Sequence, residues 1–169
     1  PAISRWPVRF AGKAIDLPLG PDIPLSLVLA IVGEDPNVKA EYAALLRHDR
    51  PALFLDVGAN VGLHSVAMRV HGIETISFEP NESCLPQLRR IADAAGVAVR
   101  IEPVALGFDR GAVDLVYPRD RTVFGSIDTV VQAGLPARGE IVRQKAVVRR
   151  LDDYFAPGAG HVLLKIDTE

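Results

Sequence analysis

The chain has 169 residues, of which 49% are hydrophobic and 24% charged, with a formal net charge of -2 and a pI near 6.1. This composition is globular, and its charge gives no overall attraction to nucleic acid or anionic membranes. A single cysteine excludes an internal disulfide and a structural zinc cluster and favours a cytoplasmic protein. The longest apolar stretch, residues 23–32, is about half of the roughly 20 residues that a membrane span needs.

The N-terminal part predicts a ribbon followed by a helix. Residues 8–20 contain short alternating apolar runs, which indicate a β-hairpin. Asp35 is placed as an N-cap with Pro36 at the first helical position, and the apolar spacing that follows predicts a helix. We therefore expect an N-terminal lead-in over residues 1–34 and a second unit over residues 35–169.

The next block alternates predicted strands and helices. Apolar runs predict strands over 52–57, 73–80 and 97–106, and helical spacing predicts helices over 62–70 and 82–95. Such alternation implies right-handed crossovers and a mostly parallel sheet. The expected fold is therefore a Rossmann-like, doubly wound α/β domain.

The pattern changes in the last third of the chain. Residues 112–118 and 145–151 read as short β segments that flank a surface loop rich in Gly, Arg and Pro. Residues 161–167, "HVLLKID", predict a fourth core strand.

The turn after the first core strand, "DVGANVG" at 56–62, is the default ligand site. Ligands of open parallel sheets bind beyond the carboxyl ends of the strands, near the point where the strand order reverses. Gly58 and Gly62 could instead only shape the turn. A dinucleotide fingerprint needs a middle glycine where phosphate approaches the backbone, and Asn60 stands there. This weakens the prediction of NAD or a flavin dinucleotide.

Acidic residues follow the predicted strands, whereas the turn itself contains no Lys or Arg. The acids are Asp56, Glu79, Asp167 and Glu169. Such a rim suits a ligand with positive charges and hydroxyls better than one with phosphates. S-adenosylmethionine has an ammonium, a sulfonium and a ribose diol, and Glu79 stands where an acid can accept hydrogen bonds from both ribose hydroxyls. A solvated acid at a strand end is the alternative interpretation of Glu79.

Several segments together resemble one family. The segments "FLDVGANVGLHSVAM", "ISFEPN", "VALG", "LDDYF" and "LLKIDTE" are similar, in that order, to the FkbM family of S-adenosylmethionine-dependent methyltransferases. The resemblance covers roughly residues 30–169 and implies a class I methyltransferase fold.

The resemblance also implies which residues hold the cofactor. The turn would surround the methionine moiety, Glu79 and Pro80 would lie at the ribose, Ala105 at the adenine and Asp167 beside the reacting methyl group. The expected turn residues are Asp56, Gly58, Ala59, Asn60, Val61 and Gly62.

The family motif continues beyond "KIDTE" with further strands, whereas this sequence stops at Glu169. We therefore expect a domain that is truncated after its fourth core strand. The apolar "HVLLKI" strand would then be an exposed sheet edge through which the chain associates with itself.

Candidate catalytic residues are Asp167, Glu169 and His64. Asp167 and Glu169 point to the same face of an extended backbone and could contact the cofactor or substrate, act as a general base or bind a divalent ion. Two carboxylates are too few for a dedicated cation cage, so no metal is predicted. His64 could act as a base or be a partly buried helix residue. In the loop, Phe124 and Ser126 are candidate substrate-binding residues, or else part of a solvated connection.

The predicted function is methyl transfer from S-adenosylmethionine to a hydroxyl of a sugar or natural product, since the family is mostly associated with O-methylation. We expect a small-molecule or glycan acceptor and no nucleic-acid partner. Two alternatives stay open: a non-catalytic cofactor-binding or interaction module, and an NAD-dependent oxidoreductase.

Overall fold

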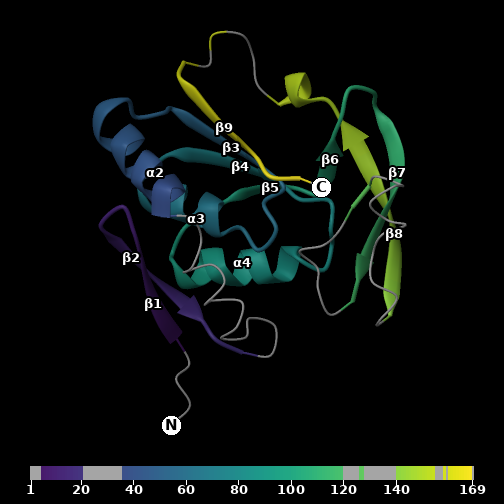
Figure 1. Ribbon diagram of the computed structural model, residues 1–169, viewed down its shortest axis with the longest axis horizontal. Coiled ribbons are helices and arrows are strands. Elements are labelled where there is room, and N and C mark those ends of the chain that lie inside the picture. The colour runs from purple at the N-terminus through teal and green to yellow at the C-terminus, as the bar shows by residue number, and fades with distance from the viewer. Residues whose placement is uncertain are drawn as a thin grey trace.

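The structure is a computed structural model that describes residues 5–20, 36–119, 126–127, 140–154, 158 and 160–168. In this part of the chain, a four-stranded sheet lies between a group of helices and a separate three-stranded sheet, and an N-terminal hairpin packs beside the helices (Figure 1).

The four-stranded sheet is parallel throughout and has the order β5-β4-β3-β9. Its strands are β3 (Leu53–Val57), β4 (Glu74–Phe78), β5 (Arg100–Glu102) and β9 (Val162–Ile166). The chain builds outward from β3 through β4 to β5 and then returns to place β9 on the other side of β3. This strand order confirms the predicted Rossmann-like α/β fold and puts the reversal of strand order between β3 and β9.

Three helices contribute to an apolar core on one face of this sheet. They are α2 (Pro36–His48), α3 (Leu63–Val70) and α4 (Leu85–Ala94), as the sequence predicted. Phe54 of β3 is fully buried in this core, and Tyr42 of α2 meets its ring edge-on at 6.0 Å between centroids. The alternation along β3 therefore sends Phe54 and Asp56 towards the helices and Leu55 and Val57 towards the opposite face.

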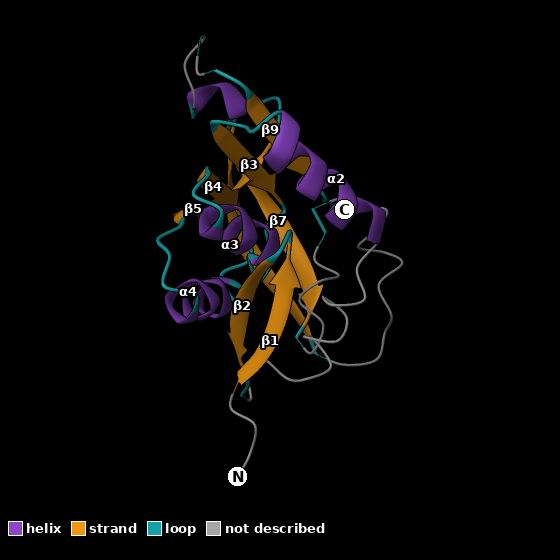
Figure 2. Ribbon diagram, turned by 90° about the vertical axis from the view of Figure 1, so that its left-hand side faces the viewer, coloured by secondary structure: helices purple, strands orange, loops and turns teal. Residues whose placement is uncertain are grey.

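The predicted N-terminal hairpin is also confirmed. Strands β1 (Arg5–Phe10) and β2 (Lys13–Pro18) pair antiparallel and lie against α3 and α4 (Figures 1 and 2). Phe10 packs 5.6 Å from the Tyr42 ring, so the hairpin shares the helical core. The boundary expected near residue 34 lies outside the described residues and stays a prediction.

The prediction of a single strand over residues 97–106 is wrong, because two strands occupy this segment. Strand β5 joins the parallel sheet, whereas β6 (Val104–Leu106) joins the three-stranded sheet. Pro103 stands between them, and its missing N–H cannot extend the ladder of β5. The chain therefore changes sheets at this residue.

The short β segments expected near 112–118 and 145–151 are longer than predicted. Strands β7 (Gly111–Pro118) and β8 (Ile141–Arg149) pair antiparallel along their whole common length, from Gly111 opposite Val148 to Pro118 opposite Ile141. Strand β8 also pairs parallel with β6, which gives the order β6-β8-β7. The region is thus a sheet of its own, and most of the predicted loop lies outside the described residues.

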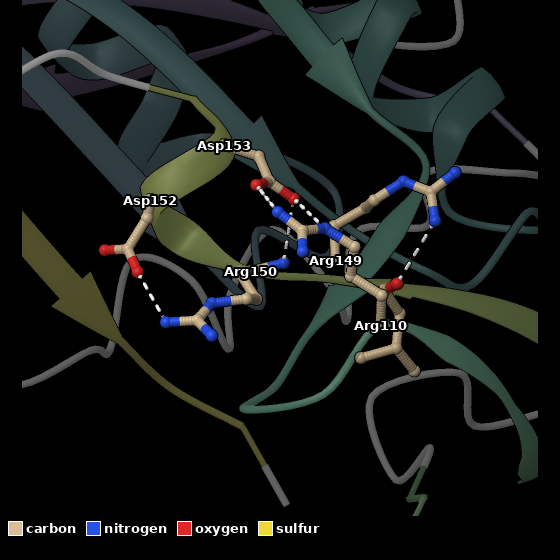
Figure 3. Close-up of polar contacts among 6 residues, drawn as sticks. Arg110, Arg149, Arg150, Asp152 and Asp153 are labelled. Carbon is tan, nitrogen blue, oxygen red and sulfur yellow. Dashed lines mark hydrogen bonds and ion pairs between the residues drawn. The ribbon is translucent and has the colours of Figure 1, made fainter.

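A short 3-10 helix, η2 (Leu151–Asp153), follows β8 and is held to the start of β7 by an ion pair. Arg110 donates from Nε to Asp153 Oδ2 at 3.0 Å, and its Nη2 donates to Oδ1 (Figure 3). These hydrogen bonds lower the pKa of the Asp153 carboxyl. The backbone N–H of Arg150 also donates to Asp153 Oδ2 at 3.3 Å, and the N–H of Asp153 donates to the carbonyl oxygen of Arg150 at 3.1 Å. The two contacts fix Leu151 beside the parallel sheet, where it packs with β3 and β4.

Strand β9 is the last strand of the four-stranded sheet and pairs only with β3 among the described residues, as expected for the "HVLLKI" segment. Leu164 and Ile166 are 41% and 66% exposed. None of the described helices combines the length and the hydrophobicity that crossing a bilayer requires.

Candidate ligand-binding site

A pocket of about 560 Å³ opens at the carboxyl ends of β3, β4 and β9, between the parallel sheet and the three-stranded sheet. Its volume falls within the range of small-molecule sites. The pocket is lined by Val57, Gly58, Asn60, Phe78, Glu79, Pro80, Asn81, Val104, Ala105, Leu106, Gly107, Leu115, Ile127, Leu151, Ile166, Asp167 and Thr168. It therefore lies at the reversal of strand order, where the sequence placed the site.

The charged residues of this lining are all acidic. Glu79 and Asp167 contribute carboxylates, and none of the described residues that form the wall is Lys, Arg or His. Ligands with several phosphates need cations or free backbone donors. The lining instead suits a ligand that carries positive charge and hydroxyls.

Gly58 lets two strand ends approach each other at the floor of the pocket. Its φ of 75° lies in the left-handed region, and a Cβ there would overlap the carbonyl oxygen of Asp167. The N–H of Asp167 donates to Val57 O at 3.0 Å, which holds the end of β9 in this position. The glycine is therefore required by the backbone of β9 as well as by the turn.

Asp56 does not line the pocket, contrary to its predicted role around a ligand. Its side chain is fully buried in a polar row across three adjacent strands, where Asp56 is in register with Ser77 on β4 and with Lys165 on β9. Lys165 Nζ donates to Asp56 Oδ1 at 3.0 Å, and Ser65 Oγ of α3 donates to Oδ2 at 2.6 Å. Ser77 in turn donates to Ser65 at 2.6 Å.

This hydrogen-bond network holds the turn of residues 56–62 in place from the interior of the protein. Lys165 also lies 3.4 Å from the carbonyl oxygen of Gly58, so one ammonium group contacts both the buried acid and the backbone of the turn. Each carboxylate oxygen of Asp56 has a donor, Lys165 for Oδ1 and Ser65 for Oδ2, and a buried carboxylate needs such partners. The acid of the "DVGANVG" motif thus positions the turn, and its contacts are internal to the protein.

The backbone donors of the turn are largely used within the protein. The N–H groups of Gly58 and Ala59 both donate to Phe78 O, at 3.0 and 3.1 Å, and the N–H of Gly62 donates to Ala59 O at 2.7 Å. The N–H of Asn60 donates to Glu79 Oε2 at 2.7 Å. In this arrangement these four N–H groups are bonded within the protein and are not free to donate to a ligand carboxylate.

Ala59, Val61 and Gly62 belong to the interior, although they were predicted to surround a ligand. Ala59 and Val61 are 4% and 5% exposed, and Val61 lies in the helical core. A Cβ on Gly62 would overlap the side chain of Leu88 on α4, so Gly62 permits the close packing of α3 against α4. Of the turn, only Gly58 and Asn60 reach the pocket.

Glu79 is the buried acid of the pocket. It is 7% exposed, and both of its oxygens accept backbone hydrogen bonds, Oε2 from Asn60 and Oε1 from Asn81 at 2.8 Å. Burial raises the pKa of the Glu79 carboxyl above its ordinary value of 4.5, although these hydrogen bonds oppose the shift. Each carboxylate oxygen has a further lone pair, so Glu79 can still accept hydrogen bonds from ligand hydroxyls.

The loop after Glu79 is tied to the three-stranded sheet. Gln144 of β8 donates from Nε2 to Pro80 O at 2.8 Å, and its Oε1 accepts from the N–H of Glu82 at 3.3 Å. Pro80, which was predicted to lie at the site, lines the pocket, and its backbone is held by Gln144 of the three-stranded sheet.

The opposite wall is apolar and includes the predicted Ala105. Val104, Ala105 and Leu106 of β6 line the pocket, and Phe78 of β4 and Leu151 of η2 add apolar surface. A flat aromatic group could lie between these side chains.

The candidate catalytic residues are not all brought together. Asp167 lines the pocket with a side chain that is 76% exposed, and its Oδ2 lies 3.5 Å from Lys165 Nζ. His64 is absent from the described lining. Its ring instead meets the ring of Tyr42, a residue of the helical core, edge-on at 5.8 Å between centroids. Glu169 lies outside the described residues.

The two predicted substrate residues fall in the segment after β7. Phe124 lies outside the described residues. Ser126 is buried and forms a β-bridge with Val116, whereas the next residue, Ile127, lines the pocket.

Sequence reasoning missed Lys165, Asn81 and Gln144. Lys165 gave a signal, because a cation inside an otherwise apolar core strand needs a buried partner on a neighbouring strand. No comparable signal marks Asn81 or Gln144, since their contacts depend on how loop and sheet come together.

Comparisons with known proteins add little to this geometry. No protein-family model and no curated protein matches the chain. Sixteen chains of solved structures match, among them the SAM-dependent methyltransferase from Agrobacterium tumefaciens, with 17% identity and a TM-score of 0.41. The match covers 59% of this chain and 32% of that one, so the chain spans about a third of that structure's length. The site is therefore assigned from this chain's own residues.

Proposed function

We propose that the protein binds S-adenosylmethionine in this pocket and is a methyltransferase. The observation that carries the proposal is the buried carboxylate of Glu79, fixed by two backbone N–H groups in a pocket whose described lining contains no cation. The motifs that resemble the FkbM family lie at the same strand ends and support the same ligand.

The residues present fit the parts of this cofactor. Glu79 would accept hydrogen bonds from the ribose hydroxyls, and the apolar side chains of β6 would cover the adenine. Asp167, exposed at the pocket wall, would lie near the positively charged methionine end. S-adenosylmethionine would supply an electrophilic methyl group on its sulfonium.

The protein's own contribution would be positioning. Such alignment of two reactants is worth roughly 7 to 11 kcal/mol of a barrier in favourable cases. Asp167 is the acid of the described lining that could accept a proton from an acceptor hydroxyl, because the proposal assigns Glu79 to the ribose hydroxyls. The proposed reaction is O-methylation of a hydroxyl on a small molecule or glycan, in the cytoplasm. The primary role proposed for Asp167 is contact with the cofactor or substrate, and the role of general base comes second.

A non-catalytic cofactor-binding module is the second candidate. The observation that favours it is the position of His64, which packs against Tyr42 and does not line the described pocket. Asp167 is then the exposed acid that the described lining offers as a catalytic base. The two candidates differ in turnover: a methyltransferase adds one methyl group to sugar or natural-product acceptors by mass spectrometry, whereas a binding module does not. Self-association through the edge of β9 also stays a prediction.

Calorimetry on the purified protein tests the proposal. We expect binding of S-adenosylmethionine and S-adenosylhomocysteine and none of NAD, because NAD brings phosphates to an acidic pocket. Replacement Glu79→Ala should weaken binding of S-adenosylhomocysteine by about 1.5 to 3 kcal/mol, the range for hydrogen bonds to charged groups.

The matched control is Glu82→Ala, since Glu82 is an exposed acid in the same loop. It should leave the affinity unchanged. Binding of NAD in preference to S-adenosylhomocysteine, or equal losses in the two variants, would contradict the proposal.

A further inference from the structure

Asn81 carries a buried donor that the fold leaves unused. The residue follows Pro80, lines the pocket and is 2% exposed. Its Oδ1 accepts from the backbone N–H of Ser83 at 3.0 Å and from Ser83 Oγ at 2.6 Å. Its Nδ2 is buried and has no hydrogen-bond partner among the described residues.

The orientation of this amide is fixed by its neighbour. The backbone N–H of Ser83 can only donate, so the oxygen of Asn81 must face it and the NH₂ group must point away. The reverse assignment would place two donors against each other. The unused donor is therefore a property of the loop and does not depend on how the amide was assigned.

Several other polar groups of this loop are bonded within the protein. The N–H of Asn81 donates to Glu79, and Gln144 bonds both Pro80 O and the N–H of Glu82. Folded proteins rarely leave a buried donor unpaired, because its lost hydration is then uncompensated. Because neighbouring polar groups of the loop do form hydrogen bonds, the spare donor of this wall residue is best explained by a partner that comes from the pocket.

We propose that Asn81 is a further ligand-binding residue, whose Nδ2 donates to an acceptor atom of the bound nucleoside. The assignment rests on the proposed function. Glu79 can only accept and the free end of Asn81 can only donate, so together they match the ribose and base of a nucleoside, which has both kinds of group. The acceptor is either a ribose hydroxyl oxygen or a ring nitrogen of the base.

The test compares variants of the two residues that form this turn. Asn81→Ser keeps an oxygen that can accept from the Ser83 N–H but lacks the NH₂ group. Ser83→Ala removes the other polar group of the turn and keeps the NH₂ group. Calorimetry with S-adenosylhomocysteine should show binding about tenfold or more weaker for Asn81→Ser and unchanged for Ser83→Ala.

Stability without ligand gives an independent readout. Because the Nδ2 donor forms no bond with the described residues, the melting temperature of ligand-free Asn81→Ser should be no lower than that of Ser83→Ala. A purely structural asparagine would instead lower stability and leave the affinity of the folded protein unchanged. Asn81→Asp provides a second variant of the same size, in which an oxygen replaces the donor, and it should also bind weakly.

Ligand analogues identify the acceptor. If Nδ2 binds a ribose oxygen, wild type and Asn81→Ser should bind the 2′,3′-dideoxy analogue of S-adenosylhomocysteine equally. If it binds a ring nitrogen of the base, the difference should vanish instead with the 1-deaza, 3-deaza or 7-deaza analogue that lacks that nitrogen. Unchanged affinity for S-adenosylhomocysteine in both folded Asn81 variants would overturn this assignment alone, whereas no binding by the wild type would overturn the proposed function and the assignment with it.

Discussion

Two rows of residues, one within three adjacent strands and one just beyond their carboxyl ends, differ in what they do. The inner row consists of Ser77, Asp56 and Lys165, which are in register on β4, β3 and β9. The outer row lies two residues further along each chain segment and consists of Glu79, Gly58 and Asp167. The inner row is covered by α3 and internally bonded, whereas the outer row lines the pocket. A shift of two residues thus separates an acid that holds the fold from acids that can meet a ligand.

The difference follows from burial and from the partners available. Asp56 is fully buried and is bonded to Lys165 and Ser65, and loss of such a partner leaves a buried carboxylate strongly destabilising. Glu79 is nearly as buried, but the two groups that donate hydrogen bonds to it are uncharged backbone N–H groups, and the Lys165 ammonium lowers its pKa only as the smallest of the contributions. The buried acid of the turn motif is thus engaged inside the protein, whereas the hydrogen bonds of Glu79 leave it able to meet a ligand.

Breaking the inner row should have the largest effect on stability. Replacement Lys165→Met removes the cation and leaves Asp56 buried with Ser65 as its remaining side-chain donor. Loss of one partner of a buried ion pair costs about 3 to 5 kcal/mol, and chemical denaturation should show a loss of this size.

The double variant Asp56→Asn with Lys165→Met is the control, because it removes the unpaired charge. It should recover at least half of the lost stability. A double variant that is less stable than Lys165→Met alone would show that the inner row does not act as an ion pair.

The second prediction sharpens the role of Gly58 in the outer row. Gly58→Ala adds a Cβ that overlaps the backbone of Asp167, at a φ of 75°. Gly96→Ala is a matched control, because Gly96 has a φ of 68° and no atom within 4 Å of an added Cβ. Both variants carry the strain of a positive φ, so the difference in their free energies of unfolding isolates the overlap, which we expect to cost about 1 to 3 kcal/mol. Equal stabilities of the two variants would mean that the backbone after β9 does not require a glycine at position 58.

The smallest expected effect is the pH dependence that Glu79 confers. Burial raises the pKa of this carboxyl in the folded protein above 4.5, and ligand hydroxyls favour its ionised form. Affinity for S-adenosylhomocysteine should therefore fall as the pH falls from neutral through the folded pKa, by at most about tenfold per pH unit. Calorimetry across this range should show the slope in the wild type and its absence in Glu79→Gln.

The stability of the ligand-free protein should respond in the opposite direction. Because the folded pKa exceeds the unfolded value, the contribution of Glu79 is fully present below the unfolded pKa and is lost as the pH rises through the folded pKa. A wild-type affinity that does not change with pH would argue against an ionised Glu79 in the complex.

Much of the fold could be predicted because its signals are local. Apolar runs and helical spacing located β3, β4, α3 and α4, and the strand order followed from their alternation. The change of sheet at Pro103 was missed, although a proline inside a predicted strand is a warning of such a break.

The site was only partly predictable for a different reason. Gly58, Asn60, Glu79 and Asp167 were identified and do line the pocket. The interior position of Asp56 depends on Lys165, which lies 109 residues away along the chain. Residues so far apart show their pairing only once the strands are aligned.

Pro103 has a consequence for how the pocket can open. A single residue separates β5, in one sheet, from β6, in the other, so the two walls are covalently tied at this side. Proline also restricts its own backbone rotation, which makes the tie stiff. The sheets cannot move apart here without breaking the pairing of β5 with β4 or of β6 with β8. Ligand exchange should therefore proceed from a side of the pocket that lies away from Pro103.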